Sequence, residues 1–272
     1  IRDGYAAHGF TSWWLDENEP DISPHAYHLH AGTGARVHNL YPLAHTEAVY
    51  NGHRDDLKTR PLILSRSAYL GAQRHGTTFW SSDISPTWDA YRRQIPAGLN
   101  VCASGMPYWS SDIGGWQPLD GDAPGDDSYK SLLLETEASR ETGGPLRGYP
   151  ELYARWFQYG AFCPTFRAHG TRPENEVWSY GPEVEKILVR YLRLRYRLLP
   201  YIYSLAYRSY RTGAPFMRAL FMDFPDDAEG LDLKDQYMFG PAFLVAPVTE
   251  PGARSRRVWL PRGADWHDFW TG

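Results

Sequence analysis

The sequence has few of the features that place a protein in a common class at once. Only two cysteines occur among its 272 residues, Cys102 and Cys163, and they are far apart in apolar surroundings. We therefore expect two buried free thiols, with neither a disulfide framework nor a zinc site. His25, His28 and His30 gather in one polar loop, but no cysteine or aspartate completes a metal-ligand spacing around them. We expect no metal and no cofactor.

Long apolar runs and an excess of either charge are also missing. No stretch approaches the ~20 apolar residues of a membrane-spanning helix. Charged residues amount to 22% of the chain and the net charge is −4, which gives neither a basic surface for nucleic acid nor a long acidic tail. We expect no membrane partner, no nucleic-acid partner and a neutral small molecule as ligand.

The first residues contain neither an initiator methionine nor a signal peptide, and they lead almost directly into a predicted strand. We expect the chain to be a fragment of a longer protein. A cytoplasmic, periplasmic or secreted location therefore stays open, and so does the oligomeric state.

Aromatic residues, in contrast, are abundant. They make up 15% of the sequence and include 11 Trp and 19 Tyr. Such a content fits either a carbohydrate site or a large aromatic core.

Residues 11–21 hold two of these tryptophans, Trp13 and Trp14, in an apolar run of strand length that ends in several acids and a proline. Carboxylates at the end of a buried strand are costly unless they are hydrogen-bonded or functional. Capping of a helix N-terminus by Asn18 or Asp21 is one explanation. It leaves the tryptophans unexplained, whereas a sugar site needs aromatic rings for pyranose faces and acceptors for hydroxyls. The segment therefore favours a sugar site.

Apolar runs and helical patterns alternate along the first part of the chain, which indicates βα units and a parallel sheet. Besides the run before Asp16, strands are predicted at 61–64, 77–80, 99–104 and 161–166, helices at 40–54, 88–97, 153–160 and 182–210, a polar loop at 22–34, and an exposed long loop or lid at 118–148. After Gly213 short strand-like runs at 216–222, 237–248 and 257–260 alternate with turns, which predicts a β domain.

One motif occurs twice. Trp80-Ser-Ser-Asp83-Ile84 returns as Trp109-Ser-Ser-Asp112-Ile113, 29 residues later, about the length of one βα unit. If the echo is structural, both aspartates lie at the same edge of the sheet, where a (β/α)₈ barrel builds its site. Coincidence in a chain rich in Trp and Ser is the alternative.

The segment Trp14-Leu15-Asp16-Glu17-Asn18-Glu19-Pro20 resembles the W-x-D-M-N-E and W-W-x-D-A-S-E-P nucleophile segments of glycoside hydrolase family 31, with Glu17 in place of the usual Met or Ala. Further motifs follow in the family's order: Arg66-Ser67-Ala68 with Gln73-Arg74, Trp80 to Asp83, Gly105-Met106-Pro107-Tyr108-Trp109 leading to Asp112-Ile113-Gly114-Gly115, and Phe166-Arg167-Ala168-His169-Gly170. The resemblance implies an α/β fold: the C-terminal part of a (β/α)₈ TIM barrel over residues 1–213, then the start of a β-sandwich domain over 214–272.

The resemblance also implies roles. Asp16 would be the nucleophile and Asp83 the acid/base of a retaining glycosidase, and the sugar would be held by Trp14, Arg66, Trp80, Asp112 and His169. Taken singly, each binding residue has an ordinary explanation: Arg66 as a structural ion pair, Trp80 as core, Asp112 as a turn acid, and His169 as a core histidine.

Several substrates remain open. Trp13-Trp14 and the Trp-Ser-Ser-Asp-Ile form around Asp83 look more like the α-xylosidase branch, whereas Asn18-Glu19 echoes the α-glucosidase form. We expect an α-xyloside hydrolase acting on a carbohydrate, with α-glucosidase and then α-galactosidase as alternatives. A transglycosylase with the same carboxylates and a catalytically silent sugar-binding protein of this fold are the other two.

Overall fold

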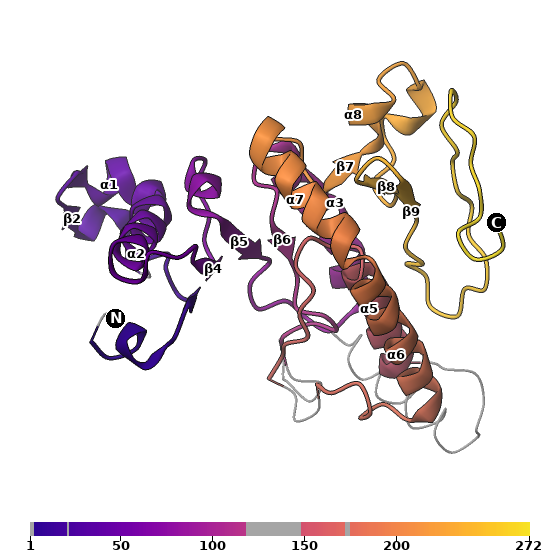
Figure 1. Cartoon of the computed structure of the whole chain (residues 1–272), viewed down its shortest axis with the longest axis horizontal. Helices are drawn as coiled ribbons and strands as arrows, with labels where there is room; N and C mark the ends of the chain where they lie inside the picture. The colour runs from indigo at the N-terminus through magenta and orange to yellow at the C-terminus, as the bar shows by residue number, and fades with distance from the viewer. Residues whose placement is uncertain (1–2, 21, 118–147, 172–174) are drawn as a thin grey trace.

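The computed structural model describes residues 3–20, 22–117, 148–171 and 175–272. Its first part contains a parallel sheet in the order β1-β4-β5-β6, which confirms the predicted parallel pairing (Figure 1). The strands are β1 (Ser12–Leu15), β4 (Leu62–Ser65), β5 (Thr77–Trp80) and β6 (Trp109–Ser110).

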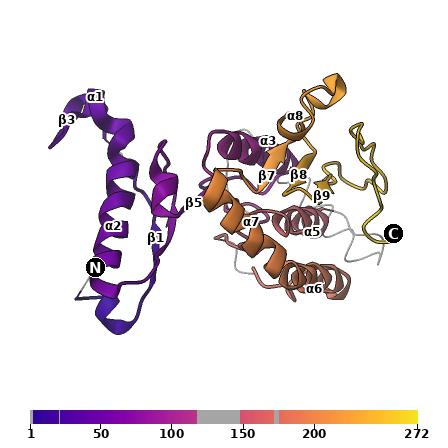
Figure 2. The ribbon, with the colours of Figure 1, turned by 45° about the horizontal axis from the view of Figure 1, so that its top comes forward.

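Helices connect these strands. α2 (Tyr41–Leu57) leads from β1 to β4, and α3 (Trp88–Ala103) leads from β5 to β6. The later helices α5 (Tyr149–Gly160), α6 (Pro182–Arg197) and α7 (Leu199–Thr212) lie on the other side of β5 from α2 (Figure 2). The helices predicted at 40–54 and 153–160 are thus confirmed, with somewhat wider bounds.

The polar loop predicted at 22–34 contains short elements. β2 (His28–Leu29) and β3 (Gly32–Thr33) form an antiparallel pair, and α1 (Gly34–Val37) follows. Single-turn 3₁₀ helices occupy Ala6–His8, Pro24–Ala26, His38–Leu40 and Ala72–His75.

The strand predicted at 99–104 is wrong, because these residues continue α3. Side chains at helical spacing along α3 are all buried, so one face of the helix extends past the interior Pro96. These side chains are Tyr91, Ile95, Leu99 and Cys102. An interior proline removes one helical hydrogen bond, so the packing of this face outweighs the local preference for a break. The strand of this βα unit is β6 instead, at the start of the second copy of the Trp-Ser-Ser-Asp-Ile motif.

The strand predicted at 161–166 is also wrong. These residues form turns after α5, and the guanidinium of the buried Arg195 donates hydrogen bonds of 2.5–2.9 Å to the carbonyl oxygens of Ala161, Cys163 and Pro164. The carbonyls are therefore occupied, and Pro164 has no N–H for a ladder. One backbone hydrogen bond, from Thr165 to the carbonyl of Trp109 at 3.1 Å, keeps the segment beside β6.

The single helix predicted at 182–210 is in fact α6 followed by α7. The break falls at Leu198, and Pro200 occupies the first turn of α7, where a missing N–H needs no partner. Among the basic residues of α6, Arg195 is buried.

The chain changes to β structure after α7, as predicted, and the strands pair antiparallel. β7 (Met217–Ala219), β8 (Tyr237–Phe239) and β9 (Phe243–Val245) form one sheet in that order. The run at 216–222 also enters the short helix α8 (Leu220–Asp223), and a 3₁₀ turn covers Ala228–Gly230. The strand predicted at 257–260 is wrong: Trp259 exchanges its backbone hydrogen bonds with the side chain of Gln236 instead of with a strand.

Much of the aromatic content fills one core that joins the two parts. The largest fully buried side chains are Trp156, Tyr91, Tyr149, Tyr153, Tyr159, Tyr237, Phe216 and Phe239. Polar tips are satisfied across the junction: the hydroxyl of Tyr237 donates to the carbonyl of Phe162 at 3.1 Å, and that of Tyr201 to Phe239 at 2.8 Å.

Both cysteines are buried and free, as predicted. Burial raises the pKa of each thiol to about 12, so Cys102 and Cys163 stay protonated. Within the described ranges, no helix is long and apolar enough to cross a membrane. Nearly all of the loop or lid predicted at 118–148 lies outside the described residues.

Candidate active site

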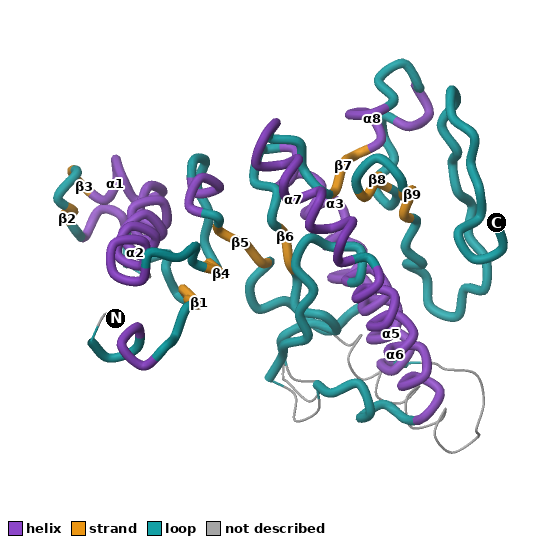
Figure 3. Tube along the Cα trace, in the orientation of Figure 1, coloured by secondary structure: helices purple, strands orange, loops and turns teal. Residues whose placement is uncertain are grey.

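The register of the sheet brings the residues that follow β1 and β4 together. Leu15 pairs with Ser65, and the N–H of Arg66 donates to the carbonyl of Leu15 at 3.1 Å. Asp16 and Arg66 therefore leave their strands at the same level, and the loop with Asp83 leaves the adjacent β5. Figure 3 shows loops leading away from the strand ends. This carboxyl edge is where parallel βα folds place their sites.

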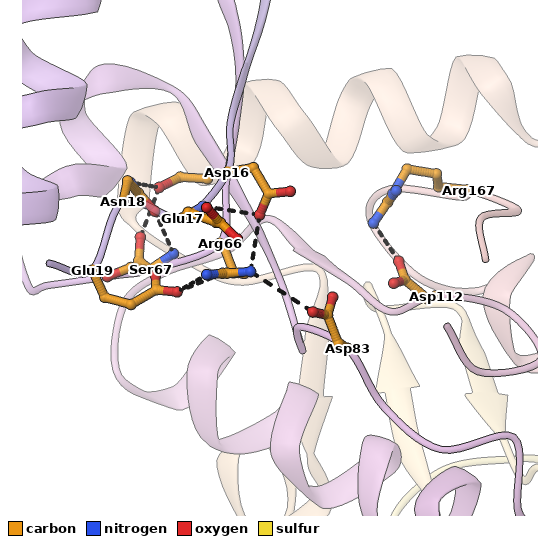
Figure 4. A network of polar contacts seen from close by, with 10 residues as sticks. Asp16, Glu17, Asn18, Glu19, Arg66, Ser67, Asp83, Asp112 and Arg167 are labelled. Atoms are coloured by element: carbon orange, nitrogen blue, oxygen red, sulfur yellow. Dashed lines mark hydrogen bonds and ion pairs between the residues drawn. The ribbon is translucent and has the colours of Figure 1, made fainter. Parts of the chain in front are cut away.

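The guanidinium of Arg66 joins three carboxylates (Figure 4). Its Nη1 lies 3.3 Å from Oδ1 of Asp16 and 3.8 Å from Oδ2 of Asp83. Its Nε and Nη2 both donate to Oε1 of Glu19. The side chain of Arg66 is 16% exposed, whereas those of Asp16 and Asp83 are 51% and 39% exposed. The cation is therefore mostly buried, while both aspartates remain accessible to a ligand.

A second network fixes the loop that carries these acids. The amide of Asn18 donates to Oγ of Ser65 at 2.7 Å and accepts from the N–H of Ser67 at 3.0 Å. Asn18 is buried and ties the loop after β1 to the loop after β4, so it does not cap a helix. Asp21, the other candidate cap, lies outside the described residues.

Each of the two aspartates has one neighbour in the chain whose backbone is in the left-handed conformation. Glu17, with φ 46°, directly follows Asp16, and Ser82, with φ 65°, directly precedes Asp83. Among the described non-glycine residues, only Lys58 shares this conformation. The N–H of Glu17 donates to Oδ1 of Asp16 at 2.9 Å. Such costly conformations collect at functional sites, where the surrounding structure enforces them.

Aromatic rings form the next part of the cluster. The ring of Trp14 lies 5.9 Å from that of Trp80 and 4.8 Å from that of His169. Trp13 contributes elsewhere, since its Nε1 donates to Nδ1 of His53 at 3.0 Å, on the opposite face of β1. Trp80 is 4% exposed but Trp14 is 48% exposed, so Trp14 has ring surface open to a ligand.

Arg167 belongs to this cluster, although no role for it was predicted from the sequence. Its guanidinium lies 5.2 Å from the ring of Trp14 and 5.4 Å from that of Trp80, and it forms an ion pair with the fully buried Asp112. Burial lowers the pKa of Arg167, against the opposing influence of Asp112 and Asp16. Its place two residues before His169 in the same motif was the signal that could have identified it.

The repeated Trp-Ser-Ser-Asp-Ile motif is only partly structural. β5 pairs with β6 so that Trp80 lies opposite Ser110 and Phe79 lies opposite Trp109. The two tryptophans therefore point to opposite faces of the sheet, and Nε1 of Trp109 donates to the hydroxyl of Tyr159 at 3.2 Å. Both aspartates nevertheless follow their strands at the same edge.

The turn after Asp112 needs glycine. Gly115 has φ 85°, and a Cβ there would lie 2.5 Å from Cα of Pro86. Only glycine allows this contact between the loops that follow β6 and β5. The close approach fixes the loop of Asp112 against that of Asp83.

The surroundings of Asp83 favour its protonated form. Burial raises the pKa of its carboxyl most, the charges of Asp16, Glu17 and Glu19 raise it further, and Arg66 lowers it. The net direction is upward, so Asp83 holds its proton to a higher pH than an ordinary aspartate does.

The structure thus brings together all seven residues named from the sequence, in two connected groups. They are Asp16, Arg66 and Asp83 around the guanidinium, and Trp14, Trp80, Asp112 and His169 around Arg167. In the part of the chain that the structure describes, no group of three or more His, Cys, Asp or Glu could hold a metal ion.

Comparisons with known proteins identify the family. Residues 1–205 match the glycosyl hydrolases family 31 TIM-barrel domain, and residues 213–272 match the family 31 C-terminal domain. The α-xylosidase of Saccharolobus solfataricus is 43% identical, over 99% of this chain and 35% of that protein. α-Glucosidase 2 of Bacillus thermoamyloliquefaciens is 32% identical, over 98% of this chain and 32% of that protein.

A solved structure agrees. The family 31 α-xylosidase from a soil metagenome, complexed with xylose, superposes with a TM-score of 0.83 at 39% identity, over 96% of this chain and 39% of that chain. The present chain spans about a third of the length of the curated relatives named above. It belongs to glycoside hydrolase family 31, as part of the TIM-barrel domain followed by a C-terminal β domain.

Proposed function

We propose that this chain carries both catalytic carboxyl groups of a retaining α-glycoside hydrolase, with Asp16 as nucleophile and Asp83 as acid/base. The observation that carries the proposal is the contact of both aspartates with one nitrogen of Arg66, at 3.3 and 3.8 Å. The two oxygens can be no farther apart than these distances together. The carboxyl groups of retaining enzymes lie roughly 5–5.5 Å apart, which is within this upper limit. Those of inverting enzymes lie roughly 6.5–9.5 Å apart, and most of that range exceeds the limit.

In the first step Asp83 gives its proton to the glycosidic oxygen while the bond from that oxygen to the anomeric carbon breaks. A carboxylate oxygen of Asp16 forms the new bond to the anomeric carbon. Arg66 and the N–H of Glu17 both contact Oδ1 of Asp16 and hold this carboxyl group in position for the attack. The leaving alcohol departs neutral, and the sugar is held as an ester.

In the second step water replaces the leaving group. Esterified Asp16 has no charge, so one of the influences that raise the pKa of Asp83 disappears. Asp83, now ionised, takes a proton from water, whose oxygen attacks the anomeric carbon and releases Asp16. Two inversions at this carbon give net retention.

The group around Arg167 is suited to bind the sugar. The exposed ring of Trp14 offers an apolar face and the half-buried His169 offers a polar group for hydroxyls, while the fully buried Asp112 supports the site through its ion pair with Arg167. Arg167 itself is held in one position, because it contacts Asp112 and both tryptophan rings. We also propose that the domain boundary falls near residue 213, where α7 ends.

Arg167→Lys should lower kcat/KM by about 10²-fold in the complete enzyme, because an ammonium ion cannot contact both tryptophan rings and Asp112 as a flat guanidinium does. The exposed substitution Arg211→Lys is the matched control. Initial rates on an aryl α-xyloside provide the measurement, and thermal melts show whether each variant is folded. A folded Arg167→Lys variant with unchanged kcat/KM would contradict a role for Arg167 in positioning.

An α-xyloside is the proposed substrate. The proposal is supported by the sequence around Asp16 and Asp83, by the similarity to the S. solfataricus α-xylosidase and by the likeness to the soil-metagenome α-xylosidase bound to xylose. α-Glucoside hydrolysis is the second candidate, favoured by Asn18-Glu19 and by the 32% identical α-glucosidase.

The complete enzyme should hydrolyse aryl α-xyloside with at least about tenfold higher kcat/KM than aryl α-glucoside or α-galactoside. The reason is that a xylose pocket needs no room for a hydroxymethyl group on C5, so a pocket wall that fills this space excludes glucose and galactose. A higher kcat/KM on glucoside or galactoside would refute the choice of xyloside while leaving the retaining mechanism intact. The same reactions with an added acceptor sugar separate hydrolysis from transfer.

A further inference from the structure

The negative charge of Glu17 has no cationic partner among the described residues. Arg66 is the guanidinium next to it, and its nitrogens already contact Asp16, Glu19 and Asp83. Glu17 itself is exposed, and its hydrogen bond to Asp16 uses the backbone N–H and leaves the carboxylate in solvent. An uncompensated carboxylate therefore stands directly beside Asp16.

Glu17 lies on one particular side of the site. In Figure 4 it stands beside Asp16 and Arg66, away from Asp112 and Arg167, which belong to the proposed sugar-binding group. The left-handed backbone at φ 46° fixes the direction in which the side chain leaves the chain. Its charge also acts on Asp83, the group that faces the leaving oxygen in the proposed mechanism. The location corresponds to the leaving group rather than to the bound sugar.

We propose that Glu17 sets the charge preference of this enzyme for the leaving group: neutral and cationic leaving groups are accepted, and anionic ones are disfavoured. The inference rests on the proposed function, in which Asp83 protonates the leaving oxygen. A carboxylate or phosphate on the leaving group would meet Glu17 in a partly exposed setting, where like charges repel over several ångströms and salt weakens the repulsion. A neutral residue at this position would remove that discrimination.

The test compares aryl α-xylosides whose phenyl ring carries a trimethylammonium, a neutral or a carboxylate substituent, or the matching α-glucosides if glucose is the preferred sugar. The quantity of interest is the ratio of kcat/KM for the cationic and anionic substrates in the complete enzyme at low ionic strength. Glu17→Gln should reduce this ratio by about 3–10-fold relative to the unmodified enzyme, because the side chain keeps its shape and loses only its charge. Comparing enzymes on the same substrates cancels intrinsic differences in leaving ability.

Three controls make the outcome specific. Glu229→Gln removes an exposed carboxylate from the C-terminal part of the chain and should leave the ratio unchanged. Raising the salt concentration to about 0.5 M should shrink the ratio in the unmodified enzyme toward that of Glu17→Gln. The basic limb of the pH profile should also move to lower pH in Glu17→Gln, since one of the charges that raise the pKa of Asp83 is gone.

An unchanged ratio in Glu17→Gln, with hydrolysis of the neutral substrate intact, would overturn the role of Glu17 and leave the proposed function standing. Failure of the proposed function gives a different result, namely no hydrolysis of any of these glycosides by the unmodified complete enzyme. A drop in the ratio for Glu229→Gln as large as that for Glu17→Gln would also overturn the inference, because it would reflect the overall charge of the protein.

Discussion

Asp16→Ala should reduce kcat of the complete enzyme by about 10⁴-fold or more, on every α-glycoside that it hydrolyses. The covalent route requires a carboxylate at this position, and the neighbouring acids are held differently: Glu19 is bound through Oε1 to Arg66, and Asp112 is buried in its pair with Arg167. Peptide mapping after reaction with a mechanism-based fluoro-glycoside should locate the adduct on Asp16.

The matched variant is Glu19→Gln, which keeps Asp16 but removes the negative charge that pairs with Nε and Nη2 of Arg66. It should still form the adduct on Asp16, at a lower rate. An adduct found on Glu19 or Asp112 in the unmodified enzyme would refute the assignment of the nucleophile.

Asp83→Ala should lower kcat/KM by about 10²–10⁴-fold for glycosides with poor leaving groups. The loss should be much smaller for activated aryl glycosides, because their leaving groups depart without needing a proton. The measurement is a series of aryl glycosides of graded leaving-group pKa. Asp112→Asn is the control, because Asp112 follows the neighbouring strand in the same sequence motif. It should impair all substrates alike, because it weakens the ion pair that positions Arg167.

The pH dependence gives an independent check on Asp83. Its pKa is raised, so the active protonated form persists to a higher pH than for an ordinary aspartate, and activity falls as the pH rises past that value. Asp83→Ala should remove this basic limb for activated substrates. Equal losses on good and poor leaving groups, with the limb retained, would shift the acid/base role to another residue, with Asp112 first in line.

Local sequence determined much of this protein. Neighbouring residues alone were enough to predict four features. These are acids at the end of the strand that holds Trp13 and Trp14, the alternation of strands with helices, the change to β structure after Gly213 and two free cysteines. The bounds of β5, the start of α3 and the β structure of the C-terminal part agree with these local predictions. The burial pattern of each short segment is set by its own residues, so it can be read without knowing the fold.

The predictions for residues 99–104 and 161–166 were wrong because contacts with residues far away along the chain decide the local structure there. The 161–166 segment is apolar enough for a strand, but Arg195 of α6 occupies its carbonyls. α3 passes Pro96 because its buried face has packing partners on both sides of the proline. In each case tertiary contacts outweigh the local preference, and they join residues that the sequence alone does not pair.

The site shows the same division. The sequence supplied its residue types through the motifs, whereas only strand register placed Asp16 beside Arg66 and sent Trp80 and Trp109 to opposite faces of the sheet. The place of Arg167 between two tryptophan rings and Asp112 likewise depends on three separate segments meeting. A one-residue change of register reverses the face of every side chain on a strand, so these contacts are decided by the tertiary structure.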